Sequence, residues 1–210
     1  MFRSYPFLQS ILPQALFSIF KDANVVSTEC IAIITKPSPS LSVDVLDLQF
    51  GLQYWSHHQE KLVGFSNARA SLSEESVTGW GVRGRPAYAY EPGPVRPYNL
   101  VTFDLPVIVS KHYLVEYTES GHSAYRHITR VMPNCAGISM NILVATHALS
   151  RSARAMPTQR IQLTETKAIN ELLAKVTTKE TEERSRCLII FANWFPKKEL
   201  PLRLNFFSLG

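Results

Sequence analysis

Six histidines are the side chains best suited to metal binding or proton transfer, yet their spacing in the sequence assembles no site. His57 and His58 are neighbours, so on an extended strand they point to opposite faces and cannot hold one ion together. His122 and His127 lie on either side of an expected turn, with no third ligand implied. The two others stand alone in the sequence: His112 and His147. We therefore predict no metal site and expect each histidine to be an ordinary buried or surface side chain.

Motifs for a catalytic nucleophile or a bound cofactor are also missing from the sequence. The segment 137–141, Gly-Ile-Ser-Met-Asn, lacks the second glycine of a nucleophile elbow, and the nine glycines form neither a phosphate loop nor a dinucleotide fingerprint. Asp44 and Asp47 do not share one face of a strand, and Glu74 and Glu75 sit at the edge of a loop. The sequence predicts a protein that is not an enzyme and needs no cofactor. An enzyme whose site has no familiar motif is an alternative.

Positive charge is concentrated in the second half of the chain. The formal net charge is +5, and no Asp or Glu occurs between Glu119 and Glu165. We predict a basic surface made by Arg126, Arg130, Arg151, Arg154, Arg160, Lys167, Lys175 and Lys179. The five from Arg151 to Lys175 are expected to form one exposed face. Such a surface favours phosphate-bearing partners, either nucleic acid or an anionic membrane, and an ordinary basic protein is the alternative.

Three cysteines are odd in number and far apart, at positions 30, 135 and 187. This pattern argues against a disulfide framework and against a Cys-x-x-Cys metal site. The chain also has no Asn-x-Ser/Thr sequence. Both absences predict a protein of the cytosol or nucleus.

Short apolar runs separated by Gly and Pro predict a largely β first half. We expect strands within 25–35 and 62–72, although a short helix would also fit the second, and we favour a strand over a helix for 43–57. Residues 7–20 carry a helical apolar stripe and predict an N-terminal helix. Four Gly and four Pro within 73–97 indicate a long loop, so the chain is one globular domain, or two packed sub-units, 1–80 and 98–210.

Alternating and continuous apolar runs continue through the second half. We expect a strand over 98–110, a hairpin over 113–131 whose turn contains Ser120 and Gly121, and further apolar strands at 138–149, 187–193 and 200–207. A helix is expected at 164–178, with Thr164 as its N-cap. Its apolar stripe is predicted to enter the core: Ile169, Leu172, Leu173 and Val176.

The order of these elements is similar to that of viral matrix proteins. A hairpin with Gly121-His122-Ser123 at its turn, an apolar strand, a basic segment and a helix containing Lys167-Ala168-Ile169-Asn170 resemble the matrix proteins of non-segmented negative-strand RNA viruses, most closely that of bornaviruses. Upstream, Gly84-Arg85-Pro86-Ala87-Tyr88 and Arg96-Pro97-Tyr98-Asn99 are similar to the centre of rhabdovirus matrix proteins. The resemblance covers residues 84–176.

This resemblance implies a structural protein of the virion that forms a homo-oligomer beneath the envelope. It would bind anionic lipid membrane and the viral ribonucleoprotein or single-stranded RNA, and would drive assembly and budding. The implied locations are the virion, the host cytoplasm or nucleus, and the inner face of the host membrane. Tyr5, Pro6 and Leu8 fit the Tyr-Pro-x-Leu pattern of late-budding motifs, which recruit a host membrane-scission adaptor, although entry into a helix with Pro6 in its first turn is the favoured explanation.

The expected fold is α+β, with mainly antiparallel strands in a sandwich or curled sheet, the N-terminal helix and the helix near 164–178. A jelly roll is the alternative fold. A viral coat protein or nucleic-acid-binding module without a membrane role is the alternative function, and an unrecognised enzyme is the second.

Overall fold

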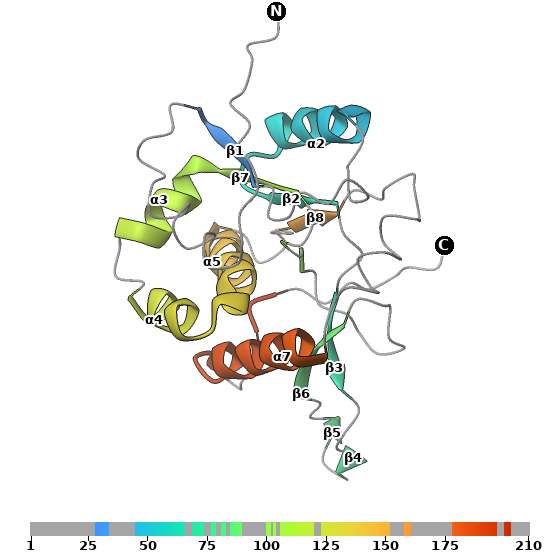
Figure 1. The fold of residues 1–210 in the computed structure, drawn as a ribbon, viewed down its shortest axis with the longest axis vertical. Coiled ribbons are helices and arrows are strands. Elements are labelled where there is room, and N and C mark those ends of the chain that lie inside the picture. Colours follow the sequence, from blue (N-terminus) through green and yellow to red (C-terminus); the bar gives the residue numbers. More distant parts are fainter. Residues whose placement is uncertain are drawn as a thin grey trace, which may run out of the picture.

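The computed structural model describes thirteen segments of the chain, and the account below is confined to them: 28–33, 45–65, 69–73, 77–78, 81–82, 85–89, 100–101, 103, 106–119, 123–151, 158–160, 178–196 and 200–202. They contain both helices and strands, so the mixed helix and sheet class is confirmed. Figure 1 shows the central sheet with α2 over one face and α5 over the other.

The central sheet has four strands in the order β1-β7-β2-β8. They span Cys30–Ile33 (β1), Val107–Ser110 (β7), Leu62–Gly64 (β2) and Thr158–Arg160 (β8). The strand β7 pairs antiparallel with both β1 and β2, whereas β8 runs parallel to β2.

Both faces of this sheet are buried, which explains why β7 reads as an unbroken Val-Ile-Val run. Val107 and Val109 face the larger part of the core, whereas Ile108 faces a smaller cluster. The helix α2 (Val45–His57) covers that second face through Trp55, with Leu48 and Leu52 packed alongside. The sheet is therefore the middle layer between helices.

The helix α5 (Ala136–Arg151) lies on the other face and is buried along most of its length. Its one fully buried amide, Asn141, serves as a backbone partner for the segment that leads to β7. The Val101 N–H donates to Asn141 Oδ1 at 2.8 Å, and Asn141 Nδ2 donates to the Val101 carbonyl at 2.8 Å and to the Gly137 carbonyl at 2.7 Å. Residue 101 belongs to no strand, so these bonds satisfy backbone groups that burial would otherwise leave unpaired.

Two glycines allow this segment to approach its neighbours closely. A Cβ at Gly64 would overlap the side chain of Val101, and one at Gly137 would lie 2.8 Å from Cδ2 of Phe103. Both positions are therefore fixed as glycine by packing, one in β2 and one in the first turn of α5.

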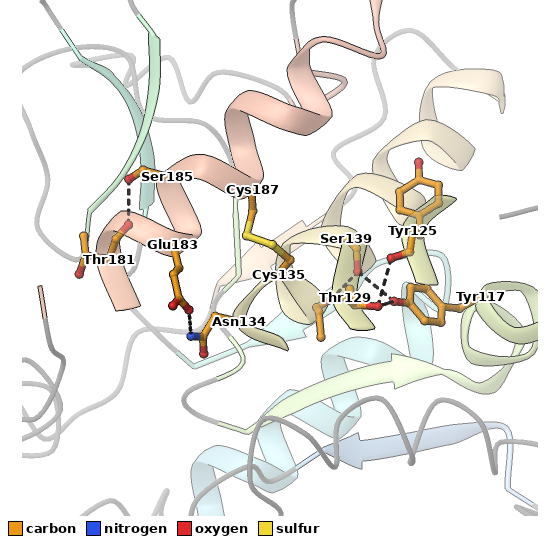
Figure 2. The surroundings of a disulfide bond; sticks show 11 residues. Tyr117, Tyr125, Thr129, Asn134, Cys135, Ser139, Thr181, Glu183, Ser185 and Cys187 are labelled. Carbon is orange, nitrogen blue, oxygen red and sulfur yellow. Dashed lines mark hydrogen bonds between the residues drawn. A yellow bond between two sulfur atoms is a disulfide. The ribbon is translucent and has the colours of Figure 1, made fainter. Parts of the chain in front are cut away.

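Three shorter helical segments, α3 (Lys111–Glu119), α4 (Ser123–Val131) and η2 (Pro133–Cys135), connect β7 to α5. Their hydroxyl groups form a buried network with α5, shown in Figure 2. Tyr117 Oη and Thr129 Oγ1 are 2.8 Å apart, and Ser139 Oγ donates to the Ala136 carbonyl at 2.7 Å. Burial raises the pKa of Tyr117, so its phenol stays neutral and can act as a donor within this network.

The last described helix, α7 (Thr178–Ala192), is fastened to this core by a disulfide between Cys135 and Cys187, whose Cα atoms are 5.6 Å apart (Figure 2). The expectation that no disulfide forms is therefore wrong. The two cysteines are distant in the sequence, and only the packing of α7 on η2 brings them together. The third cysteine, Cys30, is free and buried.

The helix α7 also packs against β6 (Arg85–Ala89), which pairs antiparallel with β3 (Arg69–Ser73). Arg184 is buried and donates to Tyr88 Oη at 3.2 Å, and the Tyr88 N–H donates to Ser185 Oγ at 3.0 Å. Two further short strands pair with each other, β4 (Val77–Thr78) and β5 (Gly81–Val82). The segment predicted as a long loop thus contains strands.

Several predicted strands are helices, and a mainly β fold is therefore not what the described residues form. The expected hairpin over 113–131 is α3 followed by α4. The strand expected at 138–149 lies within α5, the strand expected at 187–193 is the last part of α7 and the residue after it, and 43–57 contains α2. In α3 the apparent alternation is misleading, because Tyr113, Leu114 and Tyr117 are the buried residues and share a helical face. A helix that is buried along most of its length, such as α5, carries little polar stripe, so its continuous apolar run does not distinguish it from a strand.

The strands predicted at 25–35 and 62–72 are confirmed by β1 and by β2 and β3. Of the strand predicted over 98–110, only 107–110 is a strand, β7, whereas the described residues 100, 101, 103 and 106 belong to none. The expected helices at 7–20 and 164–178 lie outside the described residues, as do Leu172, Leu173 and Val176. Among the described helices, none has the length and apolar character needed to cross a membrane.

Replacing Asn141 should be costly, because its loss leaves the buried N–H and C=O of Val101 without their partners. We expect Asn141→Leu to lower the free energy of unfolding by about 2 to 5 kcal/mol. Asn193→Leu, at an exposed position after α7, is the matched control and should change it by less than about 0.5 kcal/mol. Urea unfolding followed by circular dichroism measures both, and equal effects would contradict the role given to Asn141.

The disulfide makes a separate prediction about thiols. Protein purified without reductant and then denatured should expose one titratable thiol per chain, that of Cys30, and three after reduction. Cys187→Ser should destabilise the chain by about 2 to 5 kcal/mol and make its stability insensitive to reductant. Cys30→Ala should keep the sensitivity to reductant. Three thiols before reduction, in protein made under oxidising conditions, would show that the bond does not form.

Candidate functional site

Two helices bring together three side chains that can bind a metal ion or move a proton. His112 and Glu116 come from α3, and His147 comes from α5. One ligand atom from each residue can be chosen so that all three lie within 4.8 Å of one another. His112 Nε2 lies 3.6 Å from Glu116 Oε2, and His147 Nε2–H donates to Glu116 Oε1. We refer to these three residues as the His-Glu-His cluster.

Helical geometry explains half of this arrangement and packing explains the rest. His112 and Glu116 are four residues apart, so they lie one above the other on the same face of α3. The helix begins directly after β7, and the Lys111 N–H donates to the Glu29 carbonyl at 2.9 Å. His147 stands near the C-terminal end of α5, next to the buried Ala148. The contact between α3 and α5 therefore sets the distance from His147 to the other two.

The buried ring of Tyr113 packs beside both imidazoles of the cluster. The ring of Tyr113 lies 5.3 Å from that of His112 and 5.7 Å from that of His147, measured between centroids. Its hydroxyl donates to the Glu60 carbonyl at 2.8 Å, which ties α3 to the turn before β2. The imidazoles are thus held against a fixed aromatic surface, with their rings nearly perpendicular at 87°.

The negative charge of Glu116 also influences the pKa of a second tyrosine, Tyr125. Burial raises the pKa of Tyr125, a hydrogen bond with Thr146 lowers it, and the negative charge of Glu116 raises it again. Tyr125 therefore remains a neutral phenol at physiological pH.

The three side chains of the cluster differ in their exposure to solvent. The exposed fractions of the side chains are 58% for His112, 27% for His147 and 15% for Glu116. A carboxylate that is partly withdrawn from water and flanked by two imidazoles can accept, relay or donate protons, and the same atoms can coordinate a divalent ion. Solvent or a ligand reaches this site from the His112 side.

His112 and His147 both lie beside Glu116, so the expectation that each stands alone is wrong. The four-residue spacing of His112 and Glu116 fits one face of a helix, whereas on the predicted strand residues four apart lie much farther from each other. The partner from α5 had no such signal, because its position depends on tertiary packing.

The other candidates occupy different places. Ser139, in the segment tested for a nucleophile elbow, is buried within α5. His57 ends α2, and His58 Nδ1 lies 3.9 Å from Glu60 Oε1. His127 is exposed on α4, and His122 lies outside the described residues.

The predicted basic surface can be followed only in part. Arg126 is half-buried and donates to the Thr118 carbonyl, whereas Arg130 and Lys179 are exposed. The side chains of Arg151 and Arg160 are not described, and further predicted residues lie wholly outside the described part: Arg154, Lys167, Lys175, Tyr5, Pro6 and Leu8. A single basic face therefore stays a prediction, as does self-association.

The chain was compared with protein families and with curated proteins. Residues 14–205, nearly the whole chain, match the model of the glycosyl transferase family 64 domain. No curated protein matches significantly.

This match overturns the functional interpretation of the sequence. The resemblance to viral matrix proteins is wrong, and with it the roles in the virion, in assembly and in budding, because the matching family is one of glycosyltransferases. The expectation that the protein is not an enzyme is wrong for the same reason, and the alternative of an unrecognised enzyme agrees better with the match. Over 14–205, the chain belongs to glycosyltransferase family 64.

Proposed function

We propose that this protein transfers a glycosyl group from an activated sugar donor, such as a nucleotide sugar, to a hydroxyl group of an acceptor. The observation that supports this is the family match over residues 14–205. In such a reaction the acceptor oxygen forms a bond to the anomeric carbon, the bond between that carbon and the leaving group breaks, and the leaving group keeps the electron pair. The acceptor hydroxyl loses its proton to a base.

This chemistry needs a group that takes the proton and a positive charge that stabilises the departing anion. We propose that the His-Glu-His cluster accepts the proton of the acceptor hydroxyl. Its carboxylate contacts both imidazoles, and its exposed edge at His112 leaves room for a ligand to approach. The basic residues Arg130 and Lys179 are exposed, but neither belongs to the cluster.

We also propose that the chain folds in an oxidising compartment, in place of the expected cytosol or nucleus. The disulfide between Cys135 and Cys187 supports this, because such bonds persist in secreted and lumenal proteins and are rare in reducing compartments. Protein for activity measurements should therefore be produced by secretion, so that this bond can form.

The proposed activity can be tested without knowing the acceptor. The disulfide-bonded protein is incubated with a panel of nucleotide sugars, alone and with a panel of hydroxyl acceptors, and released nucleotide and glycosylated product are measured by mass spectrometry. We expect at least one donor to be consumed. Glu116→Gln should lower that rate by roughly 10²-fold or more, as removal of a proton-transferring group does.

Glu182→Gln provides the matched control, because Glu182 is an exposed carboxylate on α7 that lies outside the cluster. It should leave the rate unchanged. If no donor is consumed by folded, disulfide-bonded protein, the proposed function is wrong. If donors are consumed equally by both variants, transfer stands and the role of the cluster in it is wrong.

A further inference from the structure

We propose that the His-Glu-His cluster binds one divalent transition-metal ion, with Zn²⁺ the preferred occupant. This inference goes beyond the proposed function and does not depend on it, because it follows from the three side chains themselves. Two imidazoles and one carboxylate form a ligand set typical of zinc sites that keep a coordination position open.

The chemistry of the ligands selects the class of ion. Imidazole nitrogen binds zinc and its neighbours in the first transition series well, whereas calcium and magnesium prefer sites made wholly of oxygen ligands. The cluster has two nitrogen ligands and no cysteine. A hard alkaline-earth ion is therefore disfavoured, and so is a thiolate-bound metal.

One separation between ligand atoms already suits a single ion, and a second pair would have to move apart to admit it. Zinc bonds of about 2.0 to 2.2 Å in a tetrahedral arrangement place neighbouring ligand atoms roughly 3.3 to 3.6 Å apart. His112 Nε2 and Glu116 Oε2 are 3.6 Å apart, too far for a direct hydrogen bond and suited to two ligands of one metal. His147 Nε2–H donates to Glu116 Oε1, so an ion bound by both atoms would replace this proton and push the two atoms apart.

The scaffold holds these ligands in place before any ion arrives. His112 and Glu116 are four positions apart on α3, a spacing that places both on one face of the helix. Tyr113, between them in the sequence, is buried and lies against both imidazole rings. His147 is carried by the most deeply buried helix of the described core. A site whose ligands stand on packed helices loses little order when it binds an ion.

One coordination position would face outward. His112 is the most exposed ligand, so the three protein atoms cover the inner side of the ion and leave the outer side to water or to an oxygen atom of a ligand. Three protein ligands with a fourth, exchangeable position distinguish such a site from a closed structural one. We therefore expect an ion that binds and dissociates without unfolding the chain.

Direct metal binding tests the inference. The full chain, purified without a polyhistidine tag and dialysed against chelator, is titrated with Zn²⁺ in a calorimeter, with no sugar donor or acceptor present. We expect saturable binding near one ion per chain and a melting temperature that rises with Zn²⁺ concentration. The same protein loaded with Co²⁺ should show visible absorption bands of a low-coordinate nitrogen and oxygen site.

Three variants make the test specific. His112→Gln and Glu116→Gln should weaken Zn²⁺ binding by at least about tenfold, the loss that even outer-shell changes cause, and should abolish the Co²⁺ bands. His112 is exposed, so its variant should fold, which circular dichroism verifies. His127→Gln, at an exposed histidine on α4, is the matched control and should bind like the wild type.

Each outcome is decisive for the site. No saturable binding by the wild type, or equal binding by His112→Gln, would overturn the proposal. Because the titration contains no substrate, a chain that binds Zn²⁺ but consumes no donor would refute only the proposed function. A chain that consumes donor without binding Zn²⁺ would refute only the metal site.

Discussion

The arrangement of the described core depends on the pairing of one buried side chain with a backbone segment. Asn141, in the middle of α5, accepts a hydrogen bond from the N–H of Val101 and donates one to its C=O, both at 2.8 Å, much as a neighbouring strand would. Because these groups are buried, water cannot replace Asn141 as their hydrogen-bond partner. The pairing therefore fixes how α5 lies against the chain that enters β7. Gly64 and Gly137 supply the room that this close approach requires.

The candidate site is a consequence of that placement. The strand β7 continues directly into α3, so fixing the entry to β7 also fixes the helix that carries His112 and Glu116. The helix α5 carries Asn141 and, six residues later, His147. His147 is therefore on the helix that binds Val101, and His112 and Glu116 are on the helix that follows the strand to which the Val101 segment leads. The disulfide between Cys135 and Cys187 fastens α7 to η2, which directly precedes α5.

The sequence predicted the sheet better than the helices. The runs around Ile31, Val63 and Ile108 are β-branched and short, and strands buried on both faces have this composition. The strand predicted at 113–117 is wrong because the spacing of Tyr113 and Tyr117 fits both an alternating strand and one face of a helix. The strand predicted at 138–149 is wrong because a helix that is buried along most of its length reads as a continuous apolar run. Neither the Cys135–Cys187 pair nor the meeting of His147 with Glu116 could be read from spacing, because both join segments that only the packed core brings together.

The family match concerns the activity of the chain, whereas the structure concerns the side chains that could carry out that activity. The match over 14–205 assigns the chain to glycosyltransferase family 64, and the described residues provide a group of ionisable side chains that could serve its chemistry. Donor binding is therefore the central claim to test. Saturation-transfer difference NMR on the disulfide-bonded chain, with a panel of nucleotide sugars, measures it directly and needs no acceptor. The account predicts that at least one donor gives a signal that excess unbound competitor removes, whereas silence from the entire panel with folded protein would contradict it.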